Sequence, residues 1–329
     1  MPALIIASTS PGAGKTAVAA GLAAHLGRDG RKVFLAKAWS ASASGDRDMA
    51  AFRALLPHTP EGFEPDRAGH GIAQVRQLAS RIQTAARGAA VSIIEGNSGD
   101  HASNMALAEA LDGLVILVVK MGDDIVPQAK QYRARLLGTV INNVPRYKSH
   151  ALEAELNPAL SQAGVRLLGA IPEDRRLIAP SLALVAEHLG AQVTVAPENA
   201  GRLIDNFLIG GLVLDWGPTY FGAQENVGVV VRGDRPDVQL AALQTDTVRA
   251  MVLTKGVSPI EYVHYEAAQR GIPVAVSPFD THETALKLES LLPKVQFDHP
   301  EKLMRMADLI EARMDLAAVN QAVAQPATR

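Results

Sequence analysis

The sequence predicts an α/β protein with a parallel sheet flanked by helices and a second, smaller α/β domain. Short apolar runs alternate with longer segments of helical pattern, which is typical of strands buried on both faces of a parallel sheet. The chain has 329 residues, which exceeds the usual size of one hydrophobic core and indicates two domains. A hydrophobic share of 48% and a charged share of 20% indicate a globular protein and exclude disorder.

Charge and cysteine content exclude several partners and chemistries. Lys and Arg number 32 against 34 Asp and Glu, so no general field draws in nucleic acid or an anionic membrane, and we expect neither as a partner. The absence of cysteine excludes disulfides, thiolate metal sites and a cysteine nucleophile. It is compatible with the cytoplasmic location that we expect.

We expect neither a signal peptide nor a membrane span. Residues 1–7 lack the basic start and the longer apolar run of a signal peptide, and they indicate a first strand. The longest apolar run in the middle of the chain, residues 114–119, is about a third of the ~20 residues needed to cross a bilayer.

The first domain is predicted to contain six strands with helices between them. The strand candidates are the apolar runs at residues 4–7, 33–36, 91–94, 114–119, 139–141 and 167–171. The helix after the first run covers residues 16–26, is rich in alanine and ends near Gly27, a typical C-terminal glycine. The first domain therefore begins with strand, loop and helix.

The second domain is predicted to begin after a linker. We expect residues 1–200 to form the first domain, with the linker starting at about 175, and residues 201–329 to form the second domain with a C-terminal helix and tail. Its strand candidates are residues 227–231, 251–254 and 272–276. Ser258 and Asp280 each precede a glutamate three residues on, which predicts two capped helix starts.

A glycine-containing loop follows the first strand and reads Ser8-Thr9-Ser10-Pro11-Gly12-Ala13-Gly14-Lys15-Thr16. In a P-loop, backbone N–H groups and the positive end of the following helix surround phosphate oxygens. Lys15 would reach the β- and γ-phosphates of a nucleotide, and the Thr16 hydroxyl would bind Mg²⁺. We therefore predict a P-loop NTPase-type sheet that binds ATP through Pro11, Gly12, Ala13, Gly14, Lys15, Thr16 and Ala17.

The spacing of this loop departs from the common pattern. That pattern requires a glycine five residues before Gly14, where this chain has Thr9, so the loop is one residue longer when it is counted from Ser8. A glycine turn that merely precedes a lysine is the alternative interpretation. The order of strand, two glycines, lysine, threonine and helix favours phosphate binding.

Magnesium requires further oxygen ligands beside Thr16, because the ion prefers an octahedral oxygen shell. Glu95 ends an apolar run and is expected at the carboxyl edge of a central strand, where open α/β sheets bind ligands. Asp48, with Asp46 as its competitor, opens a predicted helix shortly after Lys37. A solvated strand end would also explain Glu95, and ordinary helix N-terminal chemistry would explain the aspartates.

Two more strand-end residues are candidates. Lys37 ends the second predicted strand on the same edge as the loop and is expected to contact an anion or substrate, although strand-end lysines are often simply solvated. Asn142 closes the fifth predicted strand, where an amide could read a nucleotide base. A turn at Asn142-Asn143 explains the same residue nearly as well.

Together, the long loop ending Gly14-Lys15-Thr16, the strand-end Lys37, Glu95-Gly96 and Asn142-Asn143 resemble dethiobiotin synthetase over roughly residues 1–175. The resemblance implies that ATP and Mg²⁺ activate a carboxylate or carbamate. Carried over by position, Thr16, Asp48 and Glu95 would hold Mg²⁺. Lys15 and Lys37 would be catalytic beside the phosphate and the acceptor, and Asn142 would face adenine.

This sequence departs from that family in the acceptor region. Lys37 is followed by Ala38-Trp39 where the synthetases usually have proline, and Glu95 leads into Gly96-Asn97-Ser98-Gly99 where they have a Gly-Ala-Gly-Gly run. The ParA and MinD branch is less similar, because its signature lysine would fall at Ser10. ATP binding is therefore better supported than the identity of the acceptor.

The second half resembles the DRTGG domain over about residues 205–295. The resemblance is carried by Gly233-Asp234-Arg235-Pro236-Asp237, by Thr254-Lys255-Gly256 and by Gly271-Ile272-Pro273-Val274 leading to Asp280-Thr281. The name-giving motif is imperfect, since Pro236-Asp237 replaces its later residues. DRTGG domains resemble regulatory modules, and their ligand is not set by this sequence.

Two functions follow from these resemblances. The first is an ATP-dependent enzyme of the dethiobiotin synthetase type that phosphorylates an unidentified small-molecule carboxylate or carbamate. The second is a nucleotide-responsive regulatory or scaffold protein that hydrolyses ATP slowly or not at all. Because the two domains and a short tail account for the length, we expect no phosphotransacetylase activity. The resemblance also implies a homodimer.

Overall fold

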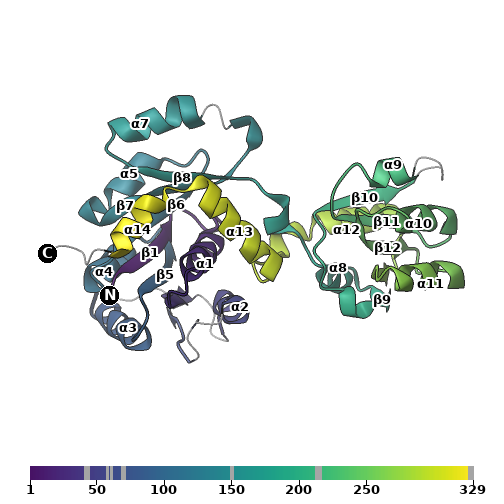
Figure 1. The fold of residues 1–329 in the computed structure, drawn as a ribbon, viewed down its shortest axis with the longest axis horizontal. Helices are drawn as coiled ribbons and strands as arrows, with labels where there is room; N and C mark the ends of the chain where they lie inside the picture. Colours follow the sequence, from purple (N-terminus) through teal and green to yellow (C-terminus); the bar gives the residue numbers. More distant parts are fainter. Residues whose placement is uncertain are drawn as a thin grey trace. The chain divides into compact units, whose positions relative to one another are not determined.

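A computed structural model describes residues 1–40, 45–56, 59, 62–67, 72–148, 152–211 and 217–324. The chain forms two compact units (Figure 1): residues 1–174 with 297–329, and residues 175–296. The last five residues of the predicted tail, 325–329, lie outside the described residues. Among the described residues, no helix is long and apolar enough to span a membrane.

The first unit contains a six-stranded parallel sheet in the order β2-β5-β1-β6-β7-β8. The strands are β1 (Ala3–Ser8), β2 (Val33–Lys37), β5 (Val91–Ser98), β6 (Leu114–Lys120), β7 (Leu136–Val144) and β8 (Leu167–Pro172). All six predicted apolar runs are therefore strands. The centres of β1, β2, β5, β6 and β7 are almost fully buried, as in Ile5 and Val118, which explains why these runs are continuous and do not alternate with polar residues.

Helices cover this sheet on both faces. They are α1 (Lys15–Gly27), α2 (Arg47–Leu55), α3 (Ile72–Ala85), α4 (His101–Ala110), α5 (Ile125–Lys130), α7 (Asn157–Gln162), α13 (Pro300–Arg313) and α14 (Leu316–Ala324). A two-stranded pair, β3 (Trp39–Ser40) and β4 (Asp66–Arg67), lies outside the sheet. The order β5-β1-β6 makes β1 a switch point: the connection through α1 runs one way and that through α4 the other. Right-handed crossovers then place α1 and α4 on opposite faces.

The second unit has a five-stranded sheet in the order β10-β11-β12-β13-β9, in which β9 alone is antiparallel to its neighbour. Its strands are β9 (Gln192–Val195), β10 (Asn206–Gly210), β11 (Val227–Arg232), β12 (Val248–Thr254) and β13 (Val274–Val276). Its helices are α8 (Leu182–Leu189), α9 (Gly217–Phe221), α10 (Pro236–Leu243), α11 (Glu261–Gln269) and α12 (Thr281–Glu289). One core cluster joins α9, α10 and α11 to the sheet, and another joins α8 and α12 to it.

The observed units differ in two places from a division at residue 200. Residues 182–195 belong to the second unit, because β9 completes its sheet beside β13 and α8 packs on its core. Residues 297–329 belong to the first unit, because α13 packs along α1, and the two helices lie side by side in Figure 1. Neither long-range pairing has a local sequence signal.

The two predicted helix starts have different outcomes. Asp280 caps α12, since its side chain accepts a hydrogen bond from the backbone N–H of Glu283 at 2.8 Å. The predicted cap at Ser258 is wrong: Ile260 is extended, with ψ of 159°, and α11 begins at Glu261 without a side-chain cap. The extended backbone at Ile260 places the helix start two residues later than a cap at Ser258 requires.

The packing of α13 on α1 generates a matched pair of tests. A Cβ atom on Gly21 would lie 2.6 Å from Met306 Cγ and 2.9 Å from Ile310 Cδ1, whereas a Cβ on Gly27 would meet nothing within 4 Å. We predict that Gly21→Ala lowers the free energy of unfolding by about 1–3 kcal/mol through overpacking. Gly27→Ala should be neutral or raise it by up to about 1 kcal/mol. Urea titration followed by circular dichroism measures both; equal effects would contradict this packing.

Candidate functional site

The loop of residues 8–16, called the phosphate loop from here on, adopts a backbone that requires glycine. Gly12 and Gly14 have φ of 70° and 92°, in the left-handed region that other residues rarely adopt. A Cβ on Gly14 would lie 2.1 Å from Asn142 Nδ2. No side chain caps the helix that starts at Lys15, so the first N–H groups of α1 are free of side-chain acceptors and suit an anion.

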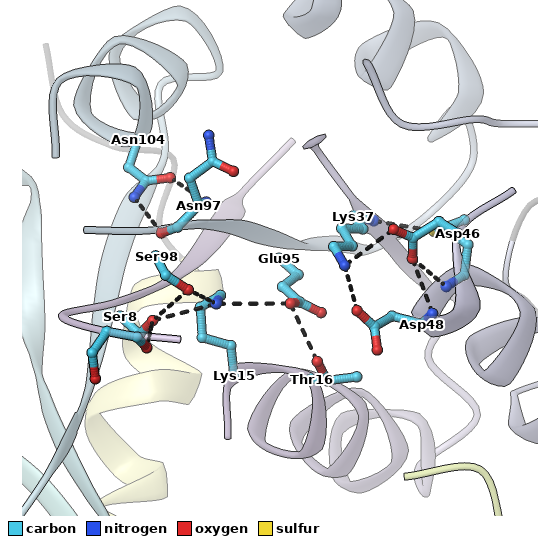
Figure 2. A network of polar contacts seen from close by, with 12 residues as sticks. Ser8, Lys15, Thr16, Lys37, Asp46, Asp48, Glu95, Asn97, Ser98 and Asn104 are labelled. Carbon is cyan, nitrogen blue, oxygen red and sulfur yellow. Dashed lines mark hydrogen bonds and ion pairs between the residues drawn. The ribbon is translucent and has the colours of Figure 1, made fainter. Parts of the chain in front are cut away.

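Parallel register brings the ends of several strands to this loop. Ser8 pairs with Ser98 on β5, Lys37 pairs with Glu95, and Lys120 pairs with Asn142. All of these pairs lie at or near the carboxyl ends of their strands, next to the switch point at β1. Figure 2 shows the network that results on the β5 side of the loop.

Lys15 is held against β5 by hydroxyl groups. Its Nζ atom donates to Ser98 Oγ at 2.6 Å and to Ser8 Oγ at 3.3 Å, and it lies 4.0 Å from Glu95 Oε1. Burial lowers the pKa of Lys15, the charge of Glu95 raises it, and Lys37 lowers it further. The contact of Ser8 and Ser98 with Lys15 was not predicted from the sequence, because only the strand register places these two serines beside Lys15.

The side chains of Glu95 and Thr16 lie within hydrogen-bond distance of each other. Thr16 Oγ1 donates to Glu95 Oε1 at 3.2 Å, and the Glu95 side chain is only 3% exposed. Its other oxygen, Oε2, is buried without a hydrogen-bond partner in the described part of the chain. Burial, followed by the charge of Asp48, raises the pKa of Glu95 to about 7, while Lys37 and Lys15 lower it. A buried, unpaired carboxylate oxygen beside a hydroxyl fits a hard cation.

Lys37 is paired with both competing aspartates. Its Nζ lies 3.1 Å from Asp46 Oδ2 and forms a short hydrogen bond to Asp48 Oδ2. Burial lowers the pKa of Lys37, but the charges of Glu95, Asp48 and Asp46 outweigh burial and raise it. The structure therefore brings Thr16 and Glu95 together and holds Asp48 against Lys37, to the right of Glu95 in Figure 2, while Lys15 lies to its left.

The two aspartates have different local roles. Asp46 is the N-cap of α2, and its Oδ1 atom accepts from the backbone N–H groups of Asp48 and Met49 at 2.9 and 3.1 Å. Its side chain is 6% exposed against 35% for Asp48. Asp48 is thus the more accessible of the two. Within the described residues, no cluster of three or more His, Cys, Asp or Glu side chains forms a complete metal site.

Asn142 lies against the phosphate loop. Its Nδ2 atom donates to the carbonyl oxygen of Ala13 at 2.9 Å, and its neighbour Asn143 has φ of 57°. Pro11 is exposed at the loop, and Ala17 is half-buried in the first turn of α1. Sequence reasoning missed a second support on the β6 side, where Asp123 Oδ2 accepts from Thr9 Oγ1 at 2.5 Å. No local pattern marks Asp123, because 114 residues separate it from Thr9.

A sheet whose first strand leads through a glycine loop into a helix, with lysine and threonine in its first turn, defines a P-loop nucleotide-binding protein. The chain belongs to the CobQ/CobB/MinD/ParA nucleotide binding domain family, whose profile matches residues 4–182. A DRTGG domain follows and matches residues 184–291. The predicted fold class and the order of the two domains are therefore confirmed.

Two kinds of enzyme are similar in sequence to this chain. A phosphate acetyltransferase of Pseudomonas putida is 29% identical over 99% of this chain and 52% of its own length. A hydrogenobyrinate a,c-diamide synthase of Brucella suis is 32% identical over 63% of this chain and 47% of its own. A chain of the MinC:MinD cell division protein complex from Aquifex aeolicus is 15% identical, with a TM-score of 0.39 over 54% of this chain and 84% of that one.

One sequence-based expectation is wrong. We expected no phosphotransacetylase, yet four relatives that match between 94% and 99% of the chain are phosphate acetyltransferases. The expectation rested on the length of the chain, and this chain spans about half the length of those relatives. The finer resemblance to dethiobiotin synthetase stays a prediction.

The buried carboxylate generates a pH prediction for the metal-free protein. Because the pKa of Glu95 rises from its usual 4.5 to about 7 on folding, the folded state holds a proton that the unfolded state has lost between these pH values. The free energy of unfolding should therefore fall as pH rises through this window, by at most about 1.4 kcal/mol per pH unit. In Glu95→Gln this component should vanish. Urea titrations of both proteins with a chelator measure the difference, and parallel pH profiles would refute it.

Proposed function

We propose that this chain binds ATP with Mg²⁺ on the phosphate loop and acts as a nucleotide-responsive regulatory part of a phosphate acetyltransferase-type protein. One observation carries the nucleotide site: Lys15 and Thr16 start an uncapped helix beside Glu95, whose buried Oε2 has no hydrogen-bond partner in the described part of the chain. The match of nearly the whole chain to phosphate acetyltransferases supports the type of protein.

Different groups of the site would bind different parts of the ligand. The backbone N–H groups of the loop and of the first turn of α1 would surround the phosphates. Lys15 would leave Ser98 and Ser8 and donate to the outer phosphates, which are stronger acceptors than hydroxyl groups. Thr16 and Glu95 would hold Mg²⁺, which would neutralise charge on the phosphates. Asp48 would join them only by releasing Lys37.

The pairing of Lys37 favours regulation over catalysis. A lysine that holds an acceptor carboxylate must present its charge to that acceptor, but Asp46 and Asp48 already neutralise Lys37. Replacing either partner would cost a partly buried ion pair. Because Lys37 is already paired, we prefer a regulatory role over phosphorylation of an acceptor that Lys37 would hold.

A route for the response runs through α1. This helix starts at the phosphate loop and packs along α13, with Arg28 donating to Asp308 at 2.7 Å and to Glu311. In the sequence, α13 follows the DRTGG domain directly. A change in α1 on nucleotide binding would therefore reach the segment that leaves that domain, without any change in the sheet.

A second candidate function is phosphorylation of a carboxylate or carbamate acceptor by ATP. It is favoured by the 31–32% identity to hydrogenobyrinate a,c-diamide synthases over 60–63% of the chain. In this case Lys37 would release its aspartates to hold the acceptor. A homodimer remains part of either proposal, and light scattering at micromolar concentration tests it.

Calorimetric titration tests the nucleotide site. We predict that Lys15→Ala weakens ATP binding at least tenfold, which is about 1.4 kcal/mol, because it removes a phosphate-binding charge. The exposed Lys130 provides the control Lys130→Ala, which should leave the affinity unchanged. Glu95→Gln should weaken binding with Mg²⁺ more than binding with a chelator, since an amide is a poor ligand for a hard cation. Unchanged ATP affinity in Lys15→Ala would contradict the assignment of the phosphate loop as the nucleotide-binding site.

A turnover assay separates the two candidate functions. For a regulatory protein we expect slow ATP loss that a panel of dicarboxylates, diamines and carbamates leaves unchanged, because Lys37 stays neutralised. An acceptor-phosphorylating enzyme should lose ATP faster with one acceptor, and Lys37→Ala should abolish that stimulation. Stimulation by any acceptor would favour the second candidate.

A further inference from the structure

Three lysines stand at the carboxyl edge of the sheet around the phosphate loop, and their charges are balanced differently. Lys37 is paired with two carboxylates. Lys15 has two hydroxyl partners and a carboxylate at 4.0 Å. Lys120, at the end of β6, has neither kind of partner on its Nζ atom: among the described residues, that atom donates only to the carbonyl oxygen of Pro11, at 3.0 Å.

The position of Lys120 is built into the fold. Its backbone N–H donates to Asp123 Oδ2 at 2.9 Å, and the same oxygen accepts from Thr9 Oγ1 at 2.5 Å. The β6–α5 turn is thereby tied to the start of the phosphate loop. The Nζ atom then lies 3.6 Å from the place where a Cβ on Gly12 would stand. Lys120 thus approaches the loop from the β6 side, while Lys15 points to the β5 side.

The charge of Lys120 lacks compensation. An ammonium group has three N–H donors and no acceptor, and Nζ uses one of them on a neutral carbonyl. No carboxylate of the described residues lies within 4.0 Å of this Nζ atom. The nearby Asp123 carboxylate instead accepts from the backbone N–H of Lys120 and from Thr9 Oγ1. An accessible ammonium group without a carboxylate partner beside the phosphate loop can therefore attract an anion that binds there.

We propose that Lys120 is a second phosphate-binding lysine of this site, which moves from the Pro11 carbonyl to a phosphate oxygen when a nucleotide binds. The inference rests on the proposed nucleotide site and deepens it by naming a second residue that would contact the phosphates. Two lysines that approach one loop from opposite sides match a chain of two or three phosphates, which carries more charge than one. The contribution of Lys120 to binding should therefore grow with the number of phosphates on the nucleotide.

A bracing role for Lys120 is the competing explanation. In that case Nζ only holds the Pro11 carbonyl, and its loss would change the loop for every nucleotide alike. Direct contact with the phosphate chain instead makes the loss depend on the number of phosphates. The dependence on phosphate number therefore distinguishes the two roles.

Titration calorimetry of the full chain with ATP, ADP and AMP tests the proposal, using Lys120→Gln, Lys120→Arg and the control Lys130→Gln. We expect Lys120→Gln to weaken ATP and ADP binding about tenfold or more and AMP binding less than twofold. Lys120→Arg should restore most of the affinity, and the control should bind like the wild type. An equal loss for all three nucleotides, or no loss, overturns the proposal.

The outcome is distinguishable from failure of the nucleotide site itself. If wild-type protein does not bind ATP, or Lys15→Ala binds it unchanged, the proposed function fails. If wild type binds, Lys15→Ala loses binding and Lys120→Gln does not, only the role of Lys120 fails.

A labelling experiment on the wild type does not depend on the stability of a variant. An amine-reactive acetylating reagent modifies accessible lysines, and mass spectrometry reports the extent at each. We expect ATP to protect Lys120 severalfold, AMP to protect it little, and Lys130 to react equally in all samples. Unchanged labelling of Lys120 at saturating ATP contradicts direct phosphate contact.

Discussion

The parallel register of β1 with β5 and β6 is the constraint on which the candidate site depends. It places Ser8 beside Ser98 and sets the ends of β5 and β6 on either side of the phosphate loop. The strands are held in that register by almost complete burial of their apolar centres, since a slip by one residue would move each side chain to the opposite face of the sheet, where it would meet a different layer of helices. Packing of the buried strand centres therefore fixes the positions of the polar side chains near the carboxyl ends of the strands.

Charge balance at this edge follows from how deeply each group is buried. Glu95 is buried, and burial together with the charge of Asp48 raises its pKa although Lys37 and Lys15 lie nearby, so the site disfavours its negative charge. Lys15 is also buried, and burial lowers its pKa although the charge of Glu95 raises it, so the site disfavours its positive charge as well. Burial therefore disfavours both charges, and their mutual attraction across 4.0 Å offsets this cost only in part. Binding of phosphate together with a metal ion would relieve both costs at once.

The first unit is completed by residues from the far end of the chain. Gly21 of α1 accepts the close approach of Met306 and Ile310 from α13, and Arg28 pairs with Asp308. A helix that begins at a nucleotide site is thus clamped by residues that come after the DRTGG domain in the sequence. This covalent order gives the nucleotide site a physical connection to the segment that follows the second unit.

Local patterns in the sequence by themselves determined the strands of the first sheet, the phosphate loop with Lys15 and Thr16, and the placement of Lys37 at the end of β2, because burial and glycine conformations leave local signals. Glu95 and Asn142 were expected at strand ends but lie in the carboxyl halves of β5 and β7, which continue to Ser98 and Val144. Tertiary structure alone decided which groups meet. Pairing of Lys37 with Asp46 and Asp48, the contact of Asn142 with Ala13, and the approach of Lys120 to Pro11 join residues whose separation in sequence has no pattern. The same holds for β9 and α13, since strand pairing and helix packing depend on distant partners that no local window contains.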